Sequence, residues 1–226
     1  MTMNPAPGPA RSMRDSNELT QTAAAWVPEH ADIEELKRAA EDCRGCELWE
    51  PATQVVFSAG NPHARLALVG EQPGDVEDRK GLPFVGPAGK LLQDALSEAE
   101  VPRDEVYVTN AVKHFRFTER GKRRIHATPQ VTHIKACRPW LEAELTLVDP
   151  ALIVCLGAIA AKSLLGTTFR VTQQRGQVLE LATPIGVRRV LATVHPSSVL
   201  RAAGEDRSAA FSGLVADLRT ARAAVA

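Results

Sequence analysis

The 226-residue chain balances 27 Lys and Arg against 27 Asp and Glu, so its formal net charge is zero. Its 44% hydrophobic and 24% charged residues are typical of a globular protein with one sizeable core. Without a net charge, binding to nucleic acid has to rest on a local basic cluster. The sequence shows neither a membrane-length apolar run nor a secretory pattern, which predicts a cytoplasmic protein with no membrane partner. A monomer is the plain expectation.

The chain is expected to divide into a leader and one domain. Residues 1–25 are rich in Pro, Ala, Ser and Thr without helical or strand periodicity, which predicts a disordered segment. The domain is expected to span residues 26–226. It opens with a predicted helix over residues 33–41, which leads into the pair Cys43-x-x-Cys46.

Four short apolar runs then alternate with helical stretches, which is the pattern of a parallel sheet flanked by helices. We predict strands at residues 66–69, 106–109, 152–156 and 190–194, and helices at about 87–100, 129–146, 157–165 and 208–224. The segments GQVLEL and VRRVLATV predict a strand pair that leads into the last strand. The expected fold is a single α/β domain with a four-stranded, mainly parallel central sheet.

Polar residues follow three of these strands directly. Glu71 and Gln72 come after the first strand, Asn110 after the second and His195 after the last. Ligands of open α/β sheets bind beyond the carboxyl ends of the strands, where such side chains converge. The organisation therefore predicts one site built from residues 71–86, 110 and 195.

Four cysteines stand at positions 43, 46, 137 and 155. A chain of this length without a secretory signal needs no disulfides, so metal or cluster ligation is the better interpretation. Cys155 lies within the apolar run IVCLG, where a small core side chain explains the residue as well as ligation does.

The run GEQPGDVEDRKGLPFVGPAGKLL at residues 70–92 closely resembles the first motif of the family 4 and family 5 uracil-DNA glycosylases, which remove uracil from DNA. VTNAVK at 108–113, HPSSVL at 195–200 and the order of the cysteines extend the resemblance to nearly everything after about residue 34. It implies the fold of that family, a small parallel sheet flanked by helices. It also implies uracil-containing DNA, single-stranded or duplex, as the partner.

The resemblance assigns roles to individual residues. Phe84 matches the aromatic side chain that stacks on the flipped uracil. Asn110 matches the amide that reads the uracil edge, since an amide both donates and accepts hydrogen bonds, as uracil N3–H and O4 require. His195 matches the residue near uracil O2, where negative charge grows as the base leaves; the alternative is a satisfied histidine at a helix start. Further substrate contacts are expected from Gln72, Gly74 and Asp75, and a DNA-backbone contact from Ser197.

The resemblance also implies a [4Fe–4S] cluster. Cys43 and Cys46 match the first ligand pair, and Cys137 and Cys155 are expected as the third and fourth ligands. Tetrahedral zinc is the alternative, because a site of four thiolates suits both.

The segment after Asn110 departs from ordinary family 4 enzymes, which have a shorter loop of the K-C-R-P-P-x-N-R kind. Here the sequence RGKRRIH at residues 120–126 closely resembles the loop of the UdgX group, in which the loop histidine becomes covalently joined to DNA after uracil leaves. Gln72, where ordinary members usually have alanine, is the second marker of that group. Lys122, Arg123 and Arg124 are expected to contact DNA phosphates and anchor the loop, the alternative being a solvated flexible loop.

The chemistry of the loop histidine agrees with this assignment. Departure of uracil leaves a cationic sugar at C1′, which water normally captures to give an abasic site. A neutral imidazole, with an ordinary pKa of about 6.5, is a better nucleophile than water. We therefore predict His126 as the nucleophile, with Glu71 stabilising the cation and accepting the proton of the other ring nitrogen. The rival hypotheses are a conventional family 4 glycosylase that turns over and a uracil-DNA or abasic-site binding module without chemistry.

Overall fold

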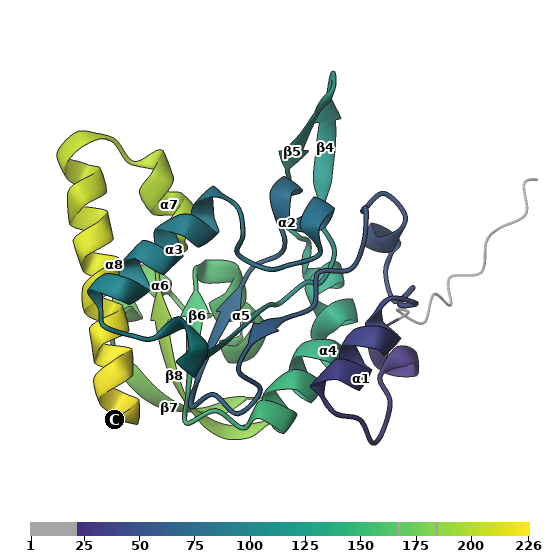
Figure 1. Cartoon of the computed structure of the whole chain (residues 1–226), viewed down its shortest axis with the longest axis horizontal. Helices are drawn as coiled ribbons and strands as arrows, with labels where there is room; N and C mark the ends of the chain where they lie inside the picture. Colours follow the sequence, from purple (N-terminus) through teal and green to yellow (C-terminus); the bar gives the residue numbers. More distant parts are fainter. Residues whose placement is uncertain (1–21, 167, 184) are drawn as a thin grey trace, which may run out of the picture.

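The computed structural model describes residues 22–166, 168–183 and 185–226, in which a six-stranded sheet has the order β1-β3-β2-β6-β8-β7 (Figure 1). The inner strands β3, β2, β6 and β8 are parallel to one another, and β1 and β7 pair antiparallel at the two edges. The α/β fold with a mainly parallel sheet is thus confirmed, and the edge strands extend it from four strands to six. The strands are Ala59–Gly60 (β1), Leu66–Gly70 (β2), Val106–Asn110 (β3), Leu152–Leu156 (β6), Val178–Thr183 (β7) and Gly186–Thr193 (β8).

The helices begin where the sequence provides helix-start signals. Asp32 and Glu35 form a capping box at the start of α1, and proline occupies the first turn of α3 and α7. No helix in the described part of the chain is long and apolar enough to cross a membrane. The α-helices are Ile33–Ala40 (α1), Asp75–Lys80 (α2), Pro87–Glu98 (α3), Val131–Val148 (α4), Ala158–Leu165 (α5), Val171–Gln174 (α6), Pro196–Arg201 (α7) and Gly204–Val225 (α8), and the 3₁₀ helices are Ala23–Trp26 (η1), Glu47–Trp49 (η2) and Arg103–Glu105 (η3).

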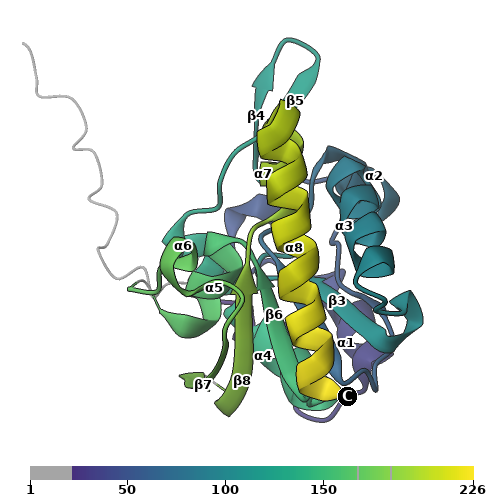
Figure 2. The ribbon, with the colours of Figure 1, turned by 90° about the vertical axis from the view of Figure 1, so that its left-hand side faces the viewer.

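Helices cover both faces of the sheet (Figure 2). Helices α3, α7 and α8 bury one face, whereas α4 and α5 bury the other. The core under α3, α7 and α8 is the first layer, and the core under α4 and α5 is the second layer. Alternate residues of a strand point to opposite faces, so Leu152, Val154 and Leu156 of β6 pack in the first layer. Ile153 and Cys155 consequently pack in the second layer.

A third core cluster joins the N-terminal part of the described chain to α4. Ala23 of η1, Leu36 of α1 and Trp140 of α4 are buried together in it. Because Ala23 is only 1% exposed, the packed domain begins before residue 26, the boundary expected from the sequence. The disorder predicted for residues 1–25 otherwise concerns residues 1–21, which lie outside the described residues.

The inserted basic segment forms a β-hairpin instead of a loop. Phe117–Arg120 (β4) and Arg123–His126 (β5) pair antiparallel in a separate two-stranded sheet, with Phe117 opposite His126. The hairpin projects from the body of the molecule beside α2 (Figure 1). Its last residue, His126, lies at the hairpin base, and residues 121 and 122 form the exposed tip.

Candidate active site

A pocket of about 870 Å³ opens at the carboxyl ends of the parallel strands. It brings together residues that are far apart in the sequence, as the order of strands and polar residues predicts. The predicted residues that line it are Glu71, Gln72, Gly74, Asp75, Phe84, Asn110, His126, His195 and Ser197.

Asn110 and Phe84 pack tightly around Gly70 at the bottom of this pocket, and the part that they line is called the base pocket below, since it is where a nucleobase would fit. A Cβ atom on Gly70 would lie 2.3 Å from Asn110 Oδ1 and 2.6 Å from Phe84 Cζ, so only glycine fits there. Phe84 itself has a φ of 55°, a left-handed backbone conformation that is unfavourable for an aromatic residue. Asn110 is 2% exposed, and its Oδ1 atom has no hydrogen-bond partner among the described residues. An acceptor buried without a partner is suited to a donor that arrives with a ligand, such as uracil N3–H.

His195 caps helix α7, and its ring is oriented by Ser197. The backbone N–H of Ser197 donates to His195 Nδ1 at 3.1 Å, which assigns the proton of the neutral ring to Nε2. Burial, together with the charges of His126 and Arg201, lowers the pKa of His195 to about 4. The imidazole is therefore neutral at physiological pH and offers an N–H donor, which fits a role beside the oxygen of a departing base.

Glu71 stands between the base pocket and the hairpin. Its Oε1 atom lies 3.8 Å from His126 Nε2 and has no hydrogen-bond partner among the described residues. Burial raises the pKa of Glu71, whereas the positive charge of Arg201 lowers it. A carboxylate beside the imidazole stabilises a positive charge that develops between them.

Gln72 connects the hairpin to the loop that follows β2. Its Nε2 atom donates to the carbonyl oxygens of Arg116 and Ala127, each at 3.1 Å, and lies 3.0 Å from His126 Nε2. Its Oε1 atom accepts a hydrogen bond from the backbone N–H of Arg116 at 3.1 Å. The amide thus binds both sides of the hairpin base and lies against the His126 ring, a positioning role in addition to the predicted substrate contact.

Arg124 anchors the hairpin on helix α2. Its guanidinium contacts Asp75 at 2.5 Å and Asp78 at 2.7 Å, and it lies over the rings of Phe115 and Phe117. Because the Arg124 side chain is only 13% exposed, it does not fit the predicted contact with DNA phosphates, and the predicted anchoring role fits it better. Asp75 is likewise engaged by this arginine and by Arg79.

Apart from Arg124, the basic side chains that could contact DNA phosphates near the pocket lie at the hairpin tip and on α7. Lys122 at the tip and Arg123 directly after it are exposed, which is compatible with phosphate contacts. Arg201 of α7, which the sequence reasoning missed, lines the pocket and donates to Ser197 Oγ at 3.1 Å. The available signal was its position four residues after Ser197 in HPSSVLR, which places both residues on one helix face.

Comparison with known proteins agrees with this geometry. The family model described as "Uracil DNA glycosylase superfamily" matches residues 57–219. The chain belongs to this superfamily. A type-4 uracil-DNA glycosylase of Thermotoga maritima is 35% identical over 170 residues, which cover 75% of this chain and 83% of that protein. The type-4 enzyme of Archaeoglobus fulgidus is 35% identical over 172 residues (74% and 83%), and a type-5 enzyme of Pyrobaculum aerophilum is 31% identical over 171 residues (68% and 70%).

In this superfamily member the four cysteines do not share one environment. Cys43 and Cys137 pack in the N-terminal core cluster with Cys46 beside them, whereas Cys155 packs under α5 in the second layer of the sheet. Burial raises the pKa of Cys137 to about 12, with Cys46 and Cys43 raising it and Lys113 lowering it. Burial alone raises the pKa of Cys155 to about 12. Three of the predicted ligands are therefore neighbours, and the fourth lies elsewhere.

A buried ion pair lies between the pocket at the strand ends and these cysteines. The Lys113 ammonium pairs with Glu144, and both side chains are at most 1% exposed. Lys113 also donates to the carbonyl oxygen of Asn110 at 3.0 Å, and its backbone N–H donates to Cys137 Sγ at 3.3 Å. Glu144 accepts hydrogen bonds from Tyr107 and Thr109. The network fixes the end of β3. Hydrophobic periodicity in the sequence could not predict this network.

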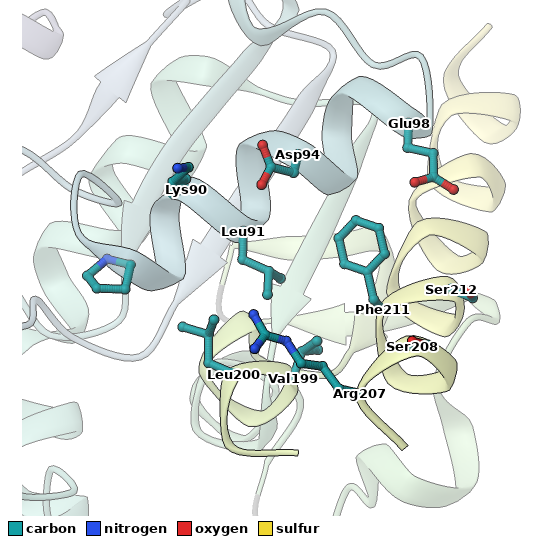
Figure 3. Close-up of a pocket in the computed structure, with 11 residues that line it drawn as sticks. Lys90, Leu91, Asp94, Glu98, Val199, Leu200, Arg207, Ser208, Phe211 and Ser212 are labelled. Atoms are coloured by element: carbon teal, nitrogen blue, oxygen red, sulfur yellow. The ribbon is translucent and has the colours of Figure 1, made fainter. Parts of the chain in front are cut away.

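A second cavity of about 650 Å³ lies between α3 and helices α7 and α8 (Figure 3). Leu91 and Phe211 line it, and so do acidic and basic side chains: Asp94, Glu98 and Lys90 of α3 and Arg207 of α8. This mixture of charges does not select DNA phosphates, in contrast to the basic hairpin tip.

Proposed function

We propose that the protein excises uracil from DNA and then becomes covalently linked to the resulting sugar through His126. One observation carries the proposal: a histidine from the inserted hairpin lines the pocket, with its Nε2 atom 3.0 Å from Gln72 Nε2 and 3.8 Å from Glu71 Oε1. The names of the type-4 relatives, at about 35% identity, support the uracil-DNA glycosylase activity. Its location in the cytoplasm and its monomeric state remain predictions of the sequence.

The first step is departure of the base. Uracil, extruded from the stack, would lie on Phe84 with N3–H donating to Asn110 Oδ1. The bond between N1 and C1′ breaks, and its electron pair leaves with the base. The neutral His195 ring would donate its Nε2 proton in a hydrogen bond to uracil O2 as negative charge grows there. The carboxylate of Glu71 would stabilise the opposite charge at the sugar.

The second step is capture of the sugar cation. A ring nitrogen of His126 would donate its lone pair to C1′ and form a carbon–nitrogen bond. The proton on the other ring nitrogen would pass to the Glu71 carboxylate, leaving a neutral alkyl imidazole, which is a poor leaving group. The uracil anion of the first step would take up this proton from Glu71 and leave as neutral uracil. Burial and the charge of Arg201 lower the pKa of His126, so its lone pair is available at neutral pH.

A conventional turning-over glycosylase is the second candidate. The type-4 relatives favour it, because their similarity spans 75% of this chain. In that case His126 would contact DNA and water would attack C1′. The two candidates share every residue of the base pocket and differ only in the role of the hairpin.

A denaturing gel after incubation with a uracil-containing oligonucleotide separates the candidates. We expect wild-type protein to shift to a slower band, and His126→Ser to release an abasic oligonucleotide without a shift. His195→Ala should slow uracil release but leave whatever product forms covalent. His63→Ser, at an exposed histidine outside the pocket, is the matched control and should behave like wild type. Persistence of the shifted band in His126→Ser would contradict the proposal.

A further inference from the structure

A small cavity beside the N-terminal core cluster collects sulfur and nitrogen donors. Cys43, Cys46, Cys137 and His114 all line it, and Cys155 does not. The four lining donors come from three segments: the turn after α1, the loop after β3 and helix α4. No group of three His, Cys, Asp or Glu residues within the described chain has an arrangement that could hold a single metal ion. The donor set therefore has to be tested against a larger group.

Two of the thiols already accept hydrogen bonds from N–H groups. Trp140 Nε1 donates to Cys43 Sγ at 3.3 Å, and the backbone N–H of Lys113 donates to Cys137 Sγ at 3.3 Å. Such bonds stabilise negative charge on sulfur, and they are one means by which proteins tune the sulfurs that bind iron–sulfur clusters. Both donors would be retained when the thiols ionise to bind iron.

His114 is the donor that lacks another function. It is 6% exposed and makes no hydrogen bond or ion pair with any described residue. A largely buried imidazole without a hydrogen-bond partner in the protein is costly, because little water reaches it. Facing a cavity lined by three cysteines, its lone pair would be satisfied by iron, a metal to which imidazole nitrogen binds in some iron–sulfur centres.

Cys155 has the opposite properties. It is fully buried in the middle of β6 and packs with Val69 and Ala160 in the second layer of the sheet. Its strand neighbours are Val69 of β2 and Ala192 of β8. Burial as a small apolar side chain explains it fully.

We propose that the cluster of this protein is held by Cys43, Cys46, Cys137 and His114, and that Cys155 is not a ligand. The donor set fits the group, because three thiolates and one imidazole provide the four ligands that a [4Fe–4S] cluster needs. When bound, the cluster would join the turn after α1 to the loop after β3 and to α4. The inference concerns the cofactor and is independent of whether His126 becomes joined to DNA.

Replacing an anionic thiolate by neutral imidazole makes the cluster less negative by one charge, which raises its reduction potential. His114→Cys would restore four thiolates, so the variant should keep its iron and show a lower potential than wild type. His114→Ala should lose iron and its visible absorption. Cys155→Ala should keep its iron and its visible absorption, and the reduction potential of its cluster should not change.

The test measures iron and sulfide content, visible absorption and reduction potential of the full chain, purified without air. Protein labelled with ¹⁵N-histidine gives an independent readout, since pulsed EPR of the reduced cluster should detect one coupled histidine nitrogen in wild type and none in His114→Cys. This readout does not depend on whether Cys155→Ala folds.

The proposal is overturned if no histidine nitrogen couples to the cluster, or if Cys155→Ala loses iron while His114→Ala retains it. Zinc without iron in the wild-type protein would overturn it as well. Uracil release measured on the same samples separates the two proposals. Loss of release with an intact histidine signal would contradict the proposed function and leave the ligand set in place.

Discussion

The base pocket and the hairpin are built in different ways. Asn110 ends β3, which pairs with β2 along its whole length and with β1 at Tyr107 and Val108, so the sheet itself fixes the pocket. The hairpin pairs its own two strands, and Gln72 and Arg124 connect it to the body through side-chain contacts. The groups proposed to read uracil are therefore held by the core, whereas the group proposed to attack the sugar is held by two side chains. Mutations should separate the two activities.

The largest expected effect is on folding stability, through the buried ion pair that supports the end of β3 and the base pocket. Glu144→Gln leaves the buried Lys113 ammonium without its counter-charge, and breaking a buried pair costs about 3–5 kcal/mol of folding stability. Denaturant unfolding measures this loss. The double variant Lys113→Met/Glu144→Leu should recover most of it, because neither charge then remains unpaired. A loss below about 1 kcal/mol in Glu144→Gln would mean that the network does not support the end of β3.

Asn110→Ala tests the pocket without disturbing the hairpin. Loss of the uracil-reading amide should slow single-turnover uracil release by about 10- to 100-fold, equivalent to the roughly 1–3 kcal/mol of an unpaired polar group on the base. Because Asn110 Oδ1 has no partner in the described structure, folding stability should change little. Release at the wild-type rate would show that the base binds elsewhere.

Arg124→Ala tests the hairpin without disturbing the pocket. Removal of its contacts to Asp75 and Asp78 frees the hairpin from α2, so the yield of covalent product should fall about tenfold, equivalent to about 1.4 kcal/mol. Uracil release should continue at the wild-type rate. Arg123→Ala, at the exposed tip, is the matched control, and it should weaken DNA binding in a salt-dependent way while retaining the covalent product. Equal losses of release and covalent product in Arg124→Ala would contradict the separation.

The smallest expected effect is a shift in pH dependence. Burial and the charge of Arg201 lower the pKa of His126, and the nucleophile has to be neutral, so covalent capture should increase as pH rises through that pKa. Arg201→Gln removes one cause, which raises the pKa toward its ordinary value of about 6.5. The acidic limb of the capture profile should therefore move to higher pH. A limb that stays in place would show that another group titrates there.

The sequence was most informative where function depends on chain order. Glu71 and His195 follow strands and Asn110 ends one, and parallel topology alone brings them to one pocket. The edge strand β1 was not predicted, because a strand of two residues is too short to show a periodic pattern. Periodicity also could not predict the contact of Arg124 with α2, because it joins Arg124 to Asp78 and Asp75, which lie 46 and 49 positions away in the sequence.

The cysteines show what a linear pattern leaves open. Four cysteines in a family's order suggest four equivalent ligands, yet alternation along β6 turns Cys155 into the sheet core. The available signal for another donor was Lys113-His114, which stands where the ordinary family 4 loop begins with Lys-Cys. Three-dimensional neighbourhood, which sequence order does not contain, identifies His114 as the candidate.

Mass analysis of the wild-type protein after incubation with a uracil-containing oligonucleotide tests the central claim most directly. We predict one species whose mass equals protein plus oligonucleotide minus one uracil, because the base leaves with a proton and the sugar remains on the imidazole. Digestion should place the modification on the peptide that contains His126. Unmodified protein together with released abasic oligonucleotide, or a modification on His195, would contradict the account.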